Sequence, residues 1–105
     1  MKEIKEGSQS YVYARPVDAS GASITPISMR YRIDCLTTCT EILDWTTVSS
    51  PTSSNTITVT ATQNRIICQS NRRERRQMVV ETTSGSGGVR NDSVDWEVKN
   101  LHGVS

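Results

Sequence analysis

The sequence predicts an all-β domain, in the form of an immunoglobulin-like or fibronectin-like antiparallel sandwich of about six or seven strands. Apolar and polar side chains alternate with a period of two in residues 29–35, 57–62 and 94–99, which is typical of strands with one buried and one solvated face. Turn-forming residues separate these stretches, and no helical stripe of useful length appears. With 105 residues, the chain is long enough for one domain with a modest core.

Composition and charge limit the classes of protein to which this chain could belong. Ser and Thr make up roughly a quarter of the chain, which suits strands and turns better than a helical bundle. The net charge of +1 argues against a globally basic nucleic-acid binder. Residues 1–6 are mostly charged, and no run approaches the roughly 18 apolar residues that cross a bilayer. We therefore expect a chain that is made and folded in a cytoplasm, with no membrane partner.

The N-terminal part of the chain differs from the rest. Residues 1–7 are mostly charged and end at Gly7, so we expect a loose arm that stays mobile unless a partner holds it. Residues 8–105 then form the single sandwich domain. Its first strand is predicted at residues 9–17, where Pro16 favours an edge position because it cannot donate to a ladder.

The middle of the chain carries the clearest strands. After a turn and a short irregular piece at residues 24–27, alternation is strongest in residues 28–36. A short polar connection leads to residues 41–48, and the two strands are predicted to form a hairpin. Residues 49–54 are a loop by composition, and residues 55–62 alternate again.

The C-terminal third is predicted to end in a second hairpin. Residues 64–69 either continue the preceding strand after a bend or pass to the other sheet. Residues 75–83 and 89–101 are the last two strands. The glycine-rich residues 84–88 connect them, since glycine permits backbone angles that other residues avoid.

The core is predicted from the apolar side of each strand. Trp45 aligns with Leu43, and Trp96 aligns with Val94 and Val98, each two positions away. Burial of side chains of this size would supply much of the stability of the sandwich. The predicted core residues are Tyr31, Ile33, Trp45, Ile57, Val59, Met78, Val80, Val94, Trp96 and Val98.

One marked cluster of charge occurs, at residues 71–76. Arginine presents a planar fork of donors, so the cluster could contact phosphate or an acidic partner. The alternative is a solvated turn in which Glu74 partly neutralises its neighbours. No aromatic stacking platform lies beside it, which favours an acidic protein surface over nucleic acid. The candidate partner-binding residues, from the arm and the cluster, are Lys2, Lys5, Arg72, Arg73, Arg75 and Arg76.

The cysteines are three in number, an odd count. In a reducing compartment Cys35, Cys39 and Cys68 are most simply free thiols, and Cys35 continues the apolar side of its strand. Together with His102 they could form a zinc site, but their scattered spacing argues against it.

Other candidate chemistry is weak. Asp92, Asp95 and Glu97 lack the spacing of a calcium loop and fit an exposed strand face better. Asp34 and Asp44 have no histidine nearby for acid–base work, and neither a nucleophile elbow nor a phosphate-binding glycine loop occurs. We therefore expect a non-enzymatic chain with no metal and no cofactor.

A family resemblance goes further than the residue chemistry. The phrases at residues 31–34, 41–46, 56–60, 64–66, 73–80 and 94–101 follow one another in an order that resembles small proteins encoded among the virion genes of tailed bacteriophages. The resemblance spans about residues 8–104. It implies an immunoglobulin-like sandwich in the virion, acting as a capsid decoration or cement protein or as a neck or tail component. The implied partners are the major capsid protein or neck and tail proteins, contacted by a homo-oligomer or a symmetric multicopy assembly. The family supplies no active-site residues.

Two other functions stay open. An adhesion module for carbohydrate or a host surface would need an exposed aromatic side chain in a groove, such as Tyr11 or Trp45. A small nucleic-acid-binding regulator would use the cluster Arg72–Arg76, and its binding would weaken steeply with salt.

Overall fold

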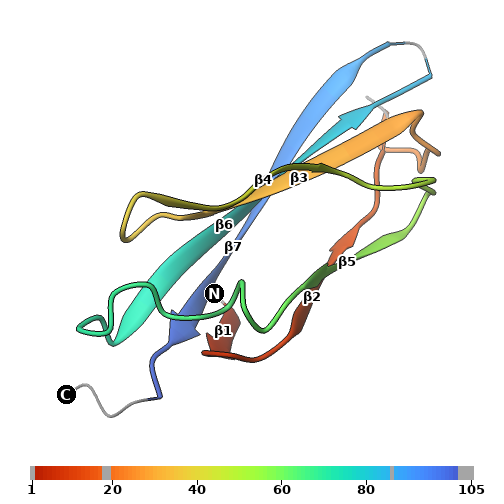
Figure 1. The fold of residues 1–105 in the computed structure, drawn as a ribbon. Coiled ribbons are helices and arrows are strands. Elements are labelled where there is room, and N and C mark those ends of the chain that lie inside the picture. Colours follow the sequence, from red (N-terminus) through yellow and green to blue (C-terminus); the bar gives the residue numbers. More distant parts are fainter. Residues whose placement is uncertain (1, 18–19, 86, 102–105) are drawn as a thin grey trace.

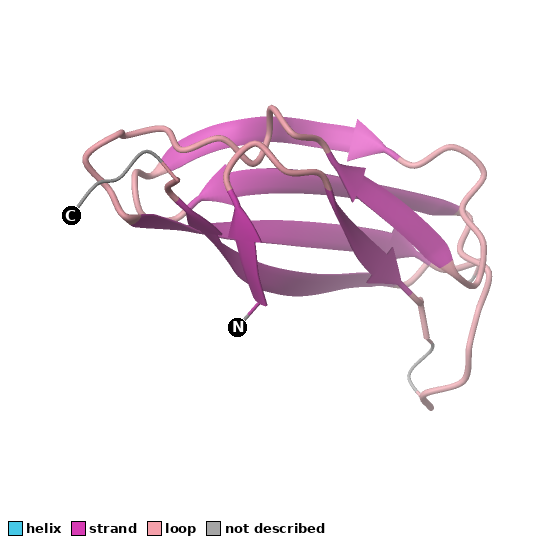
Figure 2. Ribbon diagram, turned by 90° about the horizontal axis from the view of Figure 1, so that it is seen from below, coloured by secondary structure: helices cyan, strands magenta, loops and turns pink. Residues whose placement is uncertain are grey.

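The computed structural model describes residues 2–17, 20–85 and 87–101. These residues form seven strands and no helix, in a body of 50 × 23 × 20 Å. None of them forms a helix that could cross a membrane. Figure 2 shows strands joined by loops throughout. The strands are β1 (Lys2–Lys5), β2 (Ser10–Ala14), β3 (Ser28–Cys35), β4 (Thr40–Thr47), β5 (Asn55–Val59), β6 (Arg73–Thr83) and β7 (Val89–Lys99).

The strands form two sheets. The larger sheet has the order β1-β7-β6-β3-β4, and the smaller one pairs β2 with β5. Neighbouring strands are antiparallel except β1, which runs parallel to β7. Figure 1 shows β2 and β5 to one side of the long strands of the larger sheet. The predicted all-β, two-sheet architecture is therefore confirmed.

Most predicted strands are present with shifted ends, and the differences have local causes. The strand predicted at residues 9–17 stops at Ala14, ahead of Pro16. Beyond it, an isolated bridge joins Val17 to Ser23. The expected piece at residues 24–27 is not a strand. Residues 64–69 belong to a loop of turns rather than to either sheet.

The prediction of a loose arm at residues 1–7 is wrong for Lys2–Lys5. These residues form β1, which pairs with Trp96–Lys99 of β7. Ile4 packs against the hydrophobic core, and the Glu6 N–H donates to the Lys99 carbonyl at 2.9 Å. The burial of one isoleucine and the backbone ladder together compensate for the entropy of ordering a charged segment.

The core lies between the two sheets and the loop that follows β5. Its buried residues are Met29, Ile33, Ile57, Val59, Ile66, Met78, Val80, Trp96 and Val98. Of the residues predicted for the core, those that the structure buries are Ile33, Ile57, Val59, Met78, Val80, Trp96 and Val98.

Three predicted core positions differ. Val94 is 39% exposed, because β1 stops short of it along β7 and no other strand pairs with β7 on that side among the described residues. Tyr31 is half-buried at the margin of the core. Trp45 is half-buried on the opposite face of the sheet, under the guanidinium of Arg30 at 4.3 Å from the ring centroid. Register shifts between β3 and β4 interrupt the alternation that aligned Trp45 with Leu43.

A buried asparagine joins three segments of the chain. Asn64 is fully buried, and its Oδ1 accepts a hydrogen bond from Trp96 Nε1 at 3.0 Å. Its Nδ2 donates to the Ser8 carbonyl at 2.8 Å and lies 3.0 Å from Ser10 Oγ. The loop after β5 therefore anchors both the core tryptophan and the start of β2.

Candidate binding site at an open strand edge

The arginine cluster is divided by the pleat of β6. Arg76 is fully buried and pairs with the fully buried Glu74 at 2.7 Å. The Arg76 guanidinium also donates to the carbonyls of Gln63, at 2.9 Å, and Arg65, at 2.6 Å. Arg76 therefore holds the loop after β5, and its assignment as a partner-binding residue is wrong.

Glu74 is held as a carboxylate by several donors. The backbone N–H groups of Ile67 and Cys68 donate to it at 2.7 and 2.9 Å, and Asn71 Nδ2 donates at 3.1 Å. Burial by itself raises the pKa of Glu74, but these hydrogen bonds and the one from Arg76 outweigh it and lower the pKa below its ordinary value.

The lowered pKa of Glu74 predicts an acid-sensitive contribution to stability. The stabilisation is complete above the pKa of the unfolded carboxyl, about 4.3, and is lost as the pH falls through the lower pKa of the folded state. Urea denaturation of the parent and of Glu74→Gln at several pH values measures this. We expect the stability difference to shrink from pH 7 to pH 3. A pH-independent difference would contradict the assignment.

The other cations of the predicted site are exposed, and three of them lie close together. Arg73 pairs with Glu3 at 3.2 Å, and Arg75 pairs with Asp95 at 2.7 Å. Arg72 and Arg73 line a polar cavity of about 440 Å³ with Lys99 and Asn100. Lys2 and Lys5 lie in β1, at the opposite ends of that strand. Lys5 and Arg73 lie on either side of Lys99 across the sheet, so the structure brings Lys5 close to Arg73 and Arg72. Lys2 and Arg75 lie elsewhere, opposite Trp96 and Glu97 of β7.

The cysteines and acidic residues form no cluster of metal ligands within the described residues. Cys35 is buried, whereas Cys39 and Cys68 are exposed, and all three are free thiols. A hydrogen-bond contact with Ser70, at 3.0 Å between Sγ and Oγ, lowers the pKa of the Cys68 thiol. His102 lies outside the described residues.

One edge of β7 is open along its N-terminal half. The Lys99 carbonyl accepts from Glu6 on the β1 side, and the Asn100 N–H donates to the Arg72 carbonyl on the β6 side. Backbone groups alternate between the two sides of a strand, and β7 pairs with β6 without a register shift. Odd-numbered residues of β7 therefore direct their N–H and C=O groups toward the β1 side.

The length of β1 determines where this edge becomes free. β1 reaches back along β7 only to Trp96. Figure 1 shows β1 as a short strand near the C-terminal end of β7. Asn91 and Ser93 consequently present backbone donors and acceptors to which no described strand is paired. β2 has a free edge too, because β5 is its one strand partner among the described residues. Free edges of this kind are templates for pairing with another strand.

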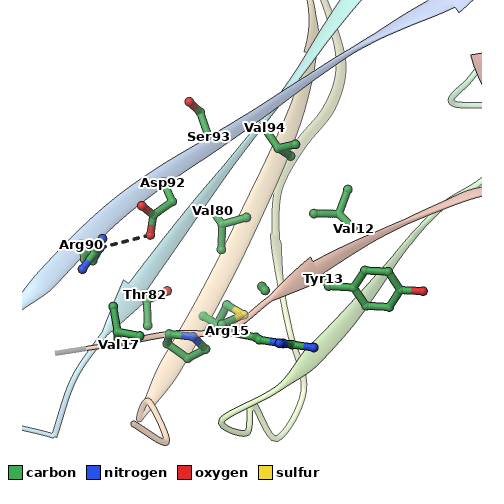
Figure 3. Close-up of a pocket in the computed structure, with 13 residues that line it drawn as sticks. Val12, Tyr13, Arg15, Val17, Val80, Thr82, Arg90, Asp92, Ser93 and Val94 are labelled. Carbon is green, nitrogen blue, oxygen red and sulfur yellow. Dashed lines mark ion pairs between the residues drawn. The ribbon is translucent and has the colours of Figure 1, made fainter. Parts of the chain in front are cut away.

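A groove runs between the free edges of β2 and β7. Two adjoining cavities of about 350 and 260 Å³ make it up, and they share Val12, Tyr13 and Val94. Met29 and Val80 line the larger cavity, and Trp96 lines the smaller one. Figure 3 shows Val12, Val80 and Val94 around the space between the two strands. We call this feature the edge groove.

Aromatic and charged side chains border the edge groove. Tyr13 is 68% exposed and Tyr11 is 46% exposed. Arg90 and Asp92, which line the larger cavity, form an exposed ion pair at 3.3 Å, drawn dashed in Figure 3. An apolar floor with a tyrosine and charged rim can bind an extended chain through both main-chain and side-chain contacts.

Sequence reasoning missed most of the edge groove. Tyr11 and Tyr13 fall within the strand predicted at residues 9–17, but the sequence does not indicate which sheet that strand joins. The burial of Glu74 and Arg76 did have a signal, because both residues are in phase with Met78 and Val80 along β6.

Comparison of the chain with protein-family models, with curated protein sequences and with solved structures finds no match.

Proposed function

We propose that this chain is a non-enzymatic structural protein of a tailed-bacteriophage virion, with an immunoglobulin-like sandwich as its fold. It docks on other virion proteins, either as a capsid decoration or cement protein or as a neck or tail component. It is made in the bacterial cytoplasm and is present in several copies per particle. The order of strand phrases given above supports the virion assignment, and the edge groove supports the docking role.

The edge groove is the observation that carries the docking role. Its floor is apolar, and its rim holds Tyr11 and Tyr13, a residue type that is enriched among the strongest contacts of protein interfaces. An extended segment of a virion protein could add to the free edge of β2 and place a side chain on Val12 and Val94. Repetition of a modest contact over a symmetric particle would raise its avidity.

Quantitative mass spectrometry of purified virions tests the docking role. We expect the chain in a reproducible number of copies per particle, and we expect Tyr13→Ser to lower its occupancy about tenfold or more. Ile27→Ser is the matched control, because Ile27 is 65% exposed and lies outside the edge groove. Absence of the parent chain from virions would overturn the proposal, and equal losses for the two variants would remove the edge groove from it.

A second candidate function is favoured by the two exposed tyrosines. An adhesion module commonly stacks an aromatic ring on a sugar, and Tyr11 and Tyr13 lie at a groove, whereas Trp45 is half-buried beneath Arg30. Titration with a panel of bacterial-surface oligosaccharides, followed by NMR shifts at Tyr11 and Tyr13, separates the two functions. Saturable shifts that Tyr13→Ala abolishes would support adhesion.

A further inference from the structure

We propose that two copies of this chain associate edge to edge, by antiparallel pairing of their β7 strands about a two-fold axis at Asn91. The inference goes beyond the proposed function, because it concerns a second copy of the chain rather than another virion protein. It rests on the open edge of β7, on its backbone geometry and on the order of its charges.

The backbone first restricts the pairing register. Odd-numbered residues of β7 direct their hydrogen-bonding groups outward. A hydrogen-bonded pair across an antiparallel edge needs outward groups from both strands. Odd-numbered residues must therefore lie opposite odd-numbered residues, so the two-fold axis passes through a residue rather than between two. Within the open edge these residues are Arg90, Asn91, Asp92 and Ser93.

Charge then selects one of these registers. An axis at Asn91 places Arg90 opposite Asp92 of the second copy, and by symmetry Asp92 opposite Arg90 of the second copy. Both side chains are exposed and on the same face of the sheet. An axis at Arg90 or at Asp92 would instead place that charged side chain directly opposite the same residue of the second copy. Opposite charges directly across a pair of strands stabilise it, and like charges destabilise it.

The extent of the open edge agrees with the same register. The axis at Asn91 pairs Val89 with Ser93 of the second copy, so the new ladder stays within the edge that β1 leaves free. An axis at Ser93 would instead bring Arg90 opposite Trp96, where β1 already occupies the edge. That register also sets the charged Asp92 against Val94.

The self-complementary order of charge identifies a second copy as the occupant. Edge strands that avoid association commonly carry charges of one sign, such as lysines. Here the signs alternate about Asn91, so the edge attracts itself in this register. It repels itself about Arg90 and Asp92, and it gains no ion pair about Ser93. A single strand pairing buries less area than the roughly 1,200 Å² of stable interfaces, so we expect a weak, concentration-dependent dimer.

Sedimentation velocity at chain concentrations from about 10 μM to 1 mM measures the association. This range is chosen because an interface of this size is expected to bind weakly. For the parent, we expect a mean mass that rises from 11.6 kDa toward twice that value. Arg90→Asp alone and Asp92→Arg alone each place like charges across the axis. Each should raise the dissociation constant about tenfold or more. Arg72→Asp carries the same charge change far along the chain and should leave association unchanged.

Two rescues make the test specific for this register. The double variant Arg90→Asp/Asp92→Arg restores opposite charges and should dimerise like the parent. An equimolar mixture of the two single variants should form the heterodimer, because each then supplies the charges that the other lacks. Circular dichroism confirms that each variant is folded.

Three results would overturn the inference: a parent that stays monomeric at 1 mM, single variants that associate like the parent, or failure of both rescues. Virion occupancy is measured separately. A dimeric chain that is absent from virions would remove the proposed function and leave this inference in place.

Discussion

Arg76→Met should lower the free energy of unfolding by about 3–5 kcal/mol. The guanidinium is fully buried and pairs with Glu74, which is buried too, so its removal leaves a carboxylate without its charge partner. The carbonyls of Gln63 and Arg65 lose their donor at the same time. Urea denaturation at pH 7 measures the loss.

Two variants make the Arg76 prediction specific. Arg72→Met changes an exposed arginine of the same cluster and should shift the unfolding free energy by no more than about 0.5 kcal/mol. The double variant Glu74→Gln/Arg76→Met should cost less than the sum of its single changes, because the buried charge is then removed from both partners. A loss below about 1 kcal/mol for Arg76→Met would show that the pair is not buried in solution.

Trp96→Ala should also cost about 3–5 kcal/mol, whereas Trp45→Ala should cost only about 1–2 kcal/mol. Trp96 is 4% exposed at the centre of the core, and its indole N–H donates to Asn64. Trp45 lies on the outer face of the sheet, where the guanidinium groups of Arg30 and Arg32 lie over its ring, at 4.3 and 5.8 Å from the centroid. Chemical denaturation of the two variants measures the difference directly.

Trp96→Phe separates packing from hydrogen bonding. Phenylalanine keeps much of the apolar volume but leaves the buried Asn64 Oδ1 without its donor, which should cost about 1–3 kcal/mol. Equal losses for Trp45→Ala and Trp96→Ala would refute the placement of the two tryptophans on opposite faces of the sheet.

The fold class was predictable because the relevant signal is local. Alternation with a period of two identified the strands and most of the side chains that reach the core, such as Ile33, Val59 and Val98. The alternation failed at Trp45, where register shifts between β3 and β4 turn the side chain to the outer face. The alternation also failed at Val94. This residue has the correct position in the alternating pattern, but β7 extends beyond the part of its edge that β1 covers.

The candidate site was hardly predictable, and the reason differs among its residues. Arg75 and Arg76 are adjacent in the same run of charged residues, but the pleat places them on opposite faces of β6. Arg75 pairs with Asp95 on the surface, and Arg76 is buried with Glu74. The sequence predicts a strand that contains Tyr13, but the exposure of this side chain depends on which sheet that strand joins. The charged residues of β1 showed no alternating pattern of useful length, so a parallel partner for β7 was not expected.

The amino-acid sequence by itself determined that this protein is built of strands and which side chains along most of them face inward, because side-chain direction follows the period of a single strand. Tertiary structure alone decided which strand edges are covered and which arginine is buried. These properties depend on pairing between segments far apart in the chain: β1 covers β7 only from Trp96 onward, and the loop after β5 closes over Arg76.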